Sequence, residues 1–194
     1  EGNYLEMILK QTEELCQNYD IDGFWYDIIP NNAVNYNTYS IEGFKEAGID
    51  VNNDLEVEKH HVEKIKLFMA SCNNIIKKYH PDASIFYNWS THMNNSNTFK
   101  YKLYEYNTSY DLEDLPTTWE GYNEFPLRAK YFSNMGKPVT GMSGKFHTAW
   151  GEFGGFKYPN ALKYEAASMI AFGANVNFGD QLHPSGIIDV ETYK

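Results

Sequence analysis

The chain has 194 residues, which is enough for one domain with its own core but short for a closed eight-stranded barrel. Its 26 acidic and 16 basic residues give a formal charge of −10, which disfavours nucleic acid and an anionic membrane surface as partners. The sequence has no apolar run of the roughly 18 residues that span a bilayer and no signal-peptide pattern, so we expect a cytoplasmic protein. Cys16 and Cys72 lie far apart in helical patterns and predict neither a disulfide framework nor a zinc cluster.

Five segments typical of strands alternate with segments typical of helices. Helical spacing of apolar residues covers 4–19, and the apolar run GFWYDII then begins at Gly23. A long loop over 30–53, with a short helix expected at 41–47, leads to a strongly periodic helix at 55–79. The later elements are expected, in order, as a strand at 84–89, a strand at 109–112, a helix at 124–135, a strand from 138, a helix at 160–172 and a strand over ANVNFGD.

This alternation predicts a parallel sheet, because each crossover helix returns the chain to the same edge. An open doubly wound sheet would carry a glycine-rich phosphate loop after its first strand, and DIIPNNA is not such a loop. Polar or reactive side chains instead follow every strand, as they do at the rim of a (β/α)₈ barrel. They are Asp27, Asn88, Trp89, Asp111, Glu113, residues 143–147, Asp180 and His183. We therefore expect an α/β fold that is part of a TIM barrel.

Carboxylates are the leading candidates for chemistry. Asp27 ends an aromatic strand beside Trp25, where it could act as a nucleophile or cap the following loop. Glu113 lies in DLEDLP, where neighbouring acids favour the protonated form that a general acid needs, although a solvated acidic turn fits equally well. Glu152, in WGEFGG, competes for the acid role. A pair of carboxylates that works without a cofactor is typical of glycosidases.

Aromatic residues make up 16% of the chain, and many of them fall in loops. Such rings either cap the core or stack on the C–H faces of sugars, and we expect stacking from Trp89 and Trp150. The histidines show no metal-binding spacing, and we expect His147 and His183 to hydrogen-bond sugar hydroxyls. A metal-dependent hydrolase that uses these two histidines and Asp180 stays open as an alternative.

Five segments that run along almost the whole chain resemble the proteins grouped as hypothetical glycosyl hydrolase 6, in the same order and spacing. They are DGFWYDI, DLEDLPTTWEGYNEFPLRAKYF, GMSGKFHTAWGEFGGFK, AL-x-YEAA and GA-x-x-x-FGDQLHPSG. That group is similar to barrel enzymes of the alpha-L-fucosidase type, including glycoside hydrolase family 29. In family 29 the nucleophile is an Asp that ends the fourth strand in a Trp-Phe-Asp-like motif, which Trp25-Tyr26-Asp27 resembles. Counting forward, Glu113 follows strand six, where the acid/base of many family 29 enzymes lies.

The resemblance implies a retaining exo-glycosidase without cofactor or metal, acting on alpha-L-fucosides or galactoside-like sugars. Asp27 would be the nucleophile and Glu113 the acid/base. The expected substrate-binding residues are Trp25, Asn88, Trp89, Asp111, His147, Trp150, Glu152, Asp180 and His183. Residues 1–194 would form a single catalytic-type domain, the C-terminal part of a (β/α)₈ barrel with strands 4–8. Three strands would precede it, and its unpaired edges could associate into a homo-oligomer.

Two features depart from the family pattern. The loop after Asp27 reads NNAVNYNTYS, without the cysteines that many relatives carry there, and Lys145 replaces an Arg before Phe-His. Lys145 keeps the charge of that Arg but not its bidentate fork. A catalytically silent carbohydrate-binding domain, which keeps the barrel rim but not the chemistry, is the main alternative to an enzyme.

Overall fold

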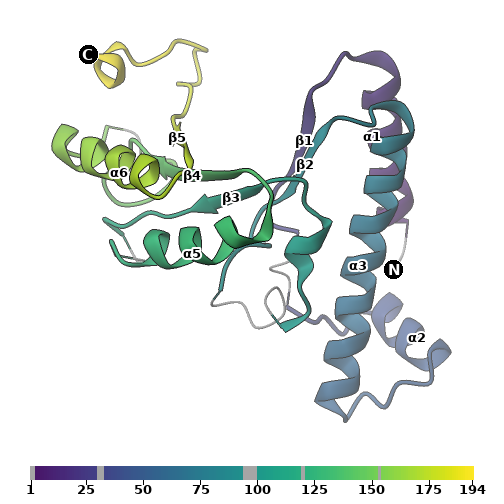
Figure 1. Cartoon of the computed structure of the whole chain (residues 1–194). Helices are drawn as coiled ribbons and strands as arrows, with labels where there is room; N and C mark the ends of the chain where they lie inside the picture. Colours follow the sequence, from purple (N-terminus) through teal and green to yellow (C-terminus); the bar gives the residue numbers. More distant parts are fainter. Residues whose placement is uncertain (1–2, 30–32, 94–99, 119–120, 153) are drawn as a thin grey trace. The chain divides into compact units, whose positions relative to one another are not determined.

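The computed structural model describes residues 3–29, 33–93, 100–118, 121–152 and 154–194 (Figure 1). The chain forms two compact units, Glu1–Thr108 and Ser109–Lys194, which we call unit 1 and unit 2. Every expected strand and helix forms, with ends that lie within three residues of the expected bounds. Residues 30–32 of the expected long loop lie outside the described residues.

Unit 1 has a two-stranded parallel sheet packed against two long helices. Its elements are α1 (Tyr4–Asn18), β1 (Gly23–Tyr26), α2 (Thr38–Glu46), α3 (Asp54–Tyr79), β2 (Ser84–Tyr87) and the 3₁₀ helix η1 (Leu103–Tyr106). Figure 1 shows α1 running alongside α3. The Asn53 side chain accepts a hydrogen bond from Glu56 N and so begins α3, as expected of an N-cap.

Alternate residues of β1 and β2 form the core of unit 1. Tyr26 stacks on Tyr87 with ring centroids 5.0 Å apart, and both rings pack edge-on against Phe68 of α3. Tyr26 Oη also lies 2.7 Å from Thr12 Oγ1 of α1. Successive side chains of a strand point to opposite faces. The residues directly before and after each of these two tyrosines therefore project away from the helices. The members of this second face are Trp25, Asp27, Phe86 and Asn88.

Unit 2 has a three-stranded parallel sheet with the strand order β3-β4-β5. Its elements are β3 (Tyr110–Glu113), α5 (Glu124–Phe132), the 3₁₀ helix η2 (Ser133–Met135), β4 (Val139–Gly144), α6 (Pro159–Ala171), β5 (Asn175–Gly179) and the 3₁₀ helix η3 (Val190–Tyr193). Asp111 pairs in register with Thr140, and Glu113 pairs with Met142.

The two faces of this sheet differ in character. Tyr110 contacts Phe132 of α5 at 4.8 Å between ring centroids, and a Cβ at Gly141 would overlap Met169 of α6, so these residues mark the helix-facing side. By alternation, the other side carries what we call the carboxylate face of unit 2, formed by Asp111, Glu113, Thr140 and Met142.

The α/β class and the parallel pairing of the strands are confirmed. Both sheets are small and open within the described part of the chain, so membership of a (β/α)₈ barrel stays a prediction, as does a single domain over 1–194. Among the described residues, no helix combines the length and apolar character needed to cross a membrane. Cys16 and Cys72 are free and buried.

Candidate functional site

Asp27 and Asn88 directly follow β1 and β2, and their side chains meet at the carboxyl ends of these strands. Asn88 Nδ2 donates a hydrogen bond to Asp27 Oδ1 at 2.7 Å, and Trp89 N donates to Asn88 Oδ1 at 2.9 Å. Each end of the amide therefore has its own partner, which fixes its orientation. Asn88 is buried whereas Asp27 is exposed. A buried amide thus orients a carboxylate that stays open to an approaching molecule.

Backbone strain is concentrated directly after this pair. Within the described residues, three non-glycine residues have a positive φ, and two of them are Ile28 (φ 53°) and Trp89 (φ 71°). This conformation is disfavoured for side chains with a Cβ, most of all for a β-branched Ile, and costs of order 1–3 kcal/mol. The chain thus turns sharply after both Asp27 and Asn88. Strain of this kind clusters at functional sites.

The two tryptophans of unit 1 lie near the carboxyl ends of their strands, Trp25 within β1 and Trp89 two residues after β2. Trp25 packs against Phe86 with ring centroids 4.6 Å apart and remains 43% exposed beside Asp27. Trp89 is half-buried and stacks on His92 at 4.2 Å, so one of its faces is already covered. That either ring binds a sugar stays a prediction.

Glu113 is the last residue of β3, and both its main-chain carbonyl and its carboxylate accept hydrogen bonds. Trp150 Nε1 donates a hydrogen bond to Glu113 Oε1 at 2.7 Å. From the helix-facing side, Arg128 of α5 donates from Nη2 to the Glu113 carbonyl oxygen. Arg128 is fully buried, and its Nε lies 3.7 Å from Glu124 Oε1. No sequence pattern pointed to Arg128, because one Arg in a mixed helix carries no distinguishing signal.

Asp111 lies two residues before Glu113 on the same face of β3. Burial raises the pKa of Asp111 to about 6, and a hydrogen bond with Thr140 opposes part of this rise. A partly buried carboxyl group whose pKa is raised by burial is typical of functional sites. The structure therefore brings Asp111, Glu113 and Trp150 together on one side of the sheet in unit 2.

Glu152, the competing acid, turns back into its own loop. Its Oε2 accepts a hydrogen bond from Thr148 N at 2.6 Å, and the hydrogen bonds from Thr148 lower the pKa of Glu152. A general acid needs the opposite shift. The lowered pKa disfavours Glu152 as the general acid, and the assignment of that role to Glu113 stays a prediction.

Lys145, which stands where the resembling proteins carry an Arg, forms an ion pair with Asp180. Lys145 Nζ lies 2.8 Å from Asp180 Oδ1, and Tyr193 Oη donates to Asp180 Oδ2 at 2.9 Å. Partial burial opposes the effect, but hydrogen bonds from Lys145, the Gln181 backbone N–H and Tyr193 lower the pKa of Asp180. This ion pair engages Lys145 within the protein, rather than leaving it free to bind a substrate carboxylate.

The two histidines expected to bind sugar are exposed. His183 Nδ1 lies 2.8 Å from Ser185 Oγ, and the backbone oxygen of His147 accepts a hydrogen bond from Thr117 Oγ1 at 2.8 Å. In the part of the chain that the structure describes, no group of three or more His, Cys, Asp and Glu residues is arranged to hold a metal ion.

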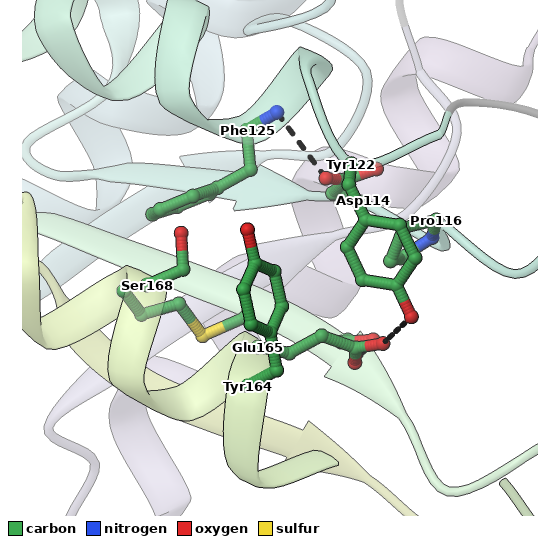
Figure 2. A pocket seen from close by; sticks show the side chains of 9 residues that line it. Asp114, Pro116, Tyr122, Phe125, Tyr164, Glu165 and Ser168 are labelled. Carbon is green, nitrogen blue, oxygen red and sulfur yellow. Dashed lines mark hydrogen bonds between the residues drawn. The ribbon is translucent and has the colours of Figure 1, made fainter. Parts of the chain in front are cut away.

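A buried ion pair that the sequence did not predict lies on the helix-facing side of β4. Lys157 Nζ donates to Glu165 Oε2 at 2.9 Å and to Ser143 Oγ at 2.8 Å, and all three side chains are buried. Figure 2 shows a pocket beside it, with the Tyr122 hydroxyl directed at Glu165. The cavity measures about 10 Å³, which is room for about one water molecule but not for a sugar.

Comparison with solved structures found an alpha-L-fucosidase, isoenzyme 2 from Paenibacillus thiaminolyticus, with a TM-score of 0.90 and 37% sequence identity. The match covers 98% of this chain and 28% of that chain, so the present chain spans little more than a quarter of the neighbour's length. No protein-family model and no curated protein sequence matches the chain. The chain is therefore similar in sequence and fold to part of a fucosidase.

Proposed function

We propose that this chain belongs to the catalytic part of a retaining glycoside hydrolase of the alpha-L-fucosidase type. The observation that carries the proposal is the 37% identity to an alpha-L-fucosidase over 98% of the chain. The five parallel strands would be strands 4–8 of a (β/α)₈ barrel in the complete protein. In barrel enzymes the residues at the carboxyl ends of the strands line the substrate site.

The chemistry proposed for the two carboxylates is a double displacement. Asp27 attacks the anomeric carbon and forms a covalent glycosyl-enzyme, while Glu113 gives its proton to the oxygen of the leaving group. Glu113 then takes a proton from water, the water oxygen attacks the same carbon, and the Asp27 carboxylate is released. The hydrogen bond from Asn88 supports this role, because it directs Asp27 Oδ1 and leaves Oδ2 as the attacking atom.

The substrate proposed is an alpha-L-fucoside or a galactoside-like sugar. Rings and polar side chains beside the two carboxylates are suited to an uncharged sugar, which offers apolar C–H faces and hydroxyl groups. The residues proposed to contact it are Trp25, Asn88, Trp89, Asp111, His147, Trp150, Glu152, Asp180 and His183.

Turnover of a panel of nitrophenyl glycosides by the full-length natural protein tests the proposal. Asp27→Asn should abolish turnover, and Glu113→Gln should lower it by about 10²–10⁴-fold. Asp82→Asn, a matched change at an exposed turn, should leave turnover unchanged. A silent carbohydrate-binding domain would instead bind sugar with unchanged affinity in both variants and turn over nothing, and that result would overturn the proposal.

A further inference from the structure

The loop over 145–157, which carries Trp150, is closed at its base by buried contacts. Lys157 N donates to the Lys145 carbonyl oxygen at 2.7 Å, and Lys145 N donates to Gly179 O at 3.0 Å. The Lys157 side chain is anchored to Ser143 of β4 and Glu165 of α6. Both ends of the loop are therefore fixed to the sheet and to a helix, so the loop is not free to swing as a whole.

The indole of Trp150 packs against two glycines at the ends of β4 and β5. A Cβ at Gly144 would lie 3.0 Å from the indole, and a Cβ at Gly179 would overlap it outright. Phe146 contacts the indole edge-on, with ring centroids 5.7 Å apart. The two glycines pair in register, so the indole lies across neighbouring strand ends, and from there its Nε1 reaches Glu113 Oε1.

We infer that Trp150 is a positioning residue for Glu113, and that its hydrogen bond decides which carboxylate oxygen transfers the proton. This inference rests on the proposed function. An indole N–H can donate but cannot accept. When Glu113 is protonated, its proton must therefore sit on Oε2, because Oε1 faces the donor of Trp150. Proton transfer then runs from Oε2 to the leaving-group oxygen, and from water back to Oε2.

The inference separates two roles that a tryptophan can have in a sugar site. A stacking ring contributes to affinity for every substrate, whereas a donor that orients the acid matters only where the leaving group needs a proton. Substrates with poor leaving groups, such as methyl glycosides and natural oligosaccharides, need that proton. Glycosyl fluorides and dinitrophenyl glycosides leave without it.

The test compares kcat/KM, which reports the first chemical step, for both kinds of substrate with Trp150→Phe in the full-length protein. Phe keeps a ring but removes the N–H. We expect kcat/KM to fall about tenfold or more on poor leaving groups, in line with a hydrogen bond to a charged group, and to change little on activated ones. We also expect KM to stay near the wild-type value, because the substitution leaves a ring in place and alters only the proton-transfer step.

Gly179→Ala provides a second, independent perturbation, because its Cβ displaces the indole without altering the tryptophan. It should give the same selective loss, and it decides the matter if Trp150→Phe does not fold. Tyr158→Phe, a conservative change of an exposed ring just after the loop, is the control and should match the wild type.

Equal losses on both kinds of substrate, or a rise in KM alone, would overturn the inference and make Trp150 a stacking surface. A wild-type protein that turns over no glycoside would instead overturn the proposed function. If Glu113→Gln is impaired as expected while Trp150→Phe matches the wild type on poor leaving groups, only the present inference fails.

Discussion

Replacing Asp111 with Asn should make the protein more stable at neutral pH, because the ionised carboxyl group is held in a partly buried place. The pKa of Asp111 is about 6 in the folded protein, compared with 3.8 for the ordinary group, and burial is the cause. The folded state therefore binds the proton more tightly than the unfolded state. Linkage then requires stability to fall as pH rises from about 4 to about 6, and the loss is complete above that range.

The size of the effect follows from the same two values. Each tenfold difference in acid dissociation is worth about 1.4 kcal/mol, so the charged group reduces the free energy of unfolding at pH 7 by about 1–3 kcal/mol once partial exposure is allowed for. Asn has nearly the same shape and carries no charge, so Asp111→Asn should recover this amount at pH 7 and almost none near pH 4. If Asp111 binds substrate as proposed, activity should fall while stability rises.

Urea unfolding of the wild type and Asp111→Asn, measured from about pH 4 to about pH 8, checks the expectation. The difference between the two free energies of unfolding should grow through the acidic range and level off above about pH 6. Asp82→Asn, at an exposed turn, should show no such trend. A difference that does not vary with pH, or an Asn variant that is less stable at pH 7, would refute the reasoning.

Three further changes test other parts of the structure. Lys157→Met should lower the free energy of unfolding by about 3–5 kcal/mol, because it strands the buried Glu165 carboxylate, and a Lys157→Met/Glu165→Leu double variant should recover most of the loss in thermal unfolding. Ile28→Gly should be neutral or stabilising by about 1 kcal/mol in urea unfolding, since it relieves a left-handed backbone at a half-exposed residue. Lys145→Met should lower the free energy of unfolding more at neutral pH than at acid pH. Lys145 lowers the pKa of Asp180, so above the ordinary pKa of that group the variant keeps an ionised carboxylate without its ion-pair partner. An equal loss of stability at both pH values would contradict this expectation.

The fold was predictable where local patterns decide it. The periodic helix at Asp54–Tyr79 and the apolar strand that precedes Asp27 follow directly from the spacing of apolar residues. Their alternation also predicted the parallel pairing of the strands, because crossover helices leave few other solutions. The sequence could not define which strands are hydrogen-bonded neighbours, since pairing depends on contacts between distant segments.

The sequence indicated which residues are candidates for the site, but not which other residues contact them. The sequence singled out Asp27, Asn88 and Glu113 as candidates because polar residues that follow apolar strands are conspicuous. Their partners were not found: the hydrogen bond from Trp150 to Glu113 joins residues 37 positions apart. The hydrogen bond from Arg128 to the Glu113 carbonyl oxygen depends on how α5 is rotated about its axis, and no spacing rule predicts that rotation.

The ion pair of Lys157 and Glu165 was missed for a different reason. Lys and Glu are mostly found at the surface, so a sequence gives no reason to place them in a core. Glu165 lies on the buried side of α6, and Lys157 precedes that helix by two residues. The glycines under Trp150 were likewise unremarkable in sequence, and only the close approach of the indole explains why a Cβ is excluded at Gly144 and Gly179.

Trapping of the glycosyl-enzyme tests the central claim most directly. A 2-deoxy-2-fluoro glycosyl fluoride of the sugar that the full-length protein turns over should inactivate it by forming a covalent adduct that hydrolyses slowly. After proteolysis, mass spectrometry should find the added sugar on the peptide that contains Trp25-Tyr26-Asp27, with Asp27 as the labelled residue. A label on any other residue, or hydrolysis with inversion and no adduct at all, would contradict the account.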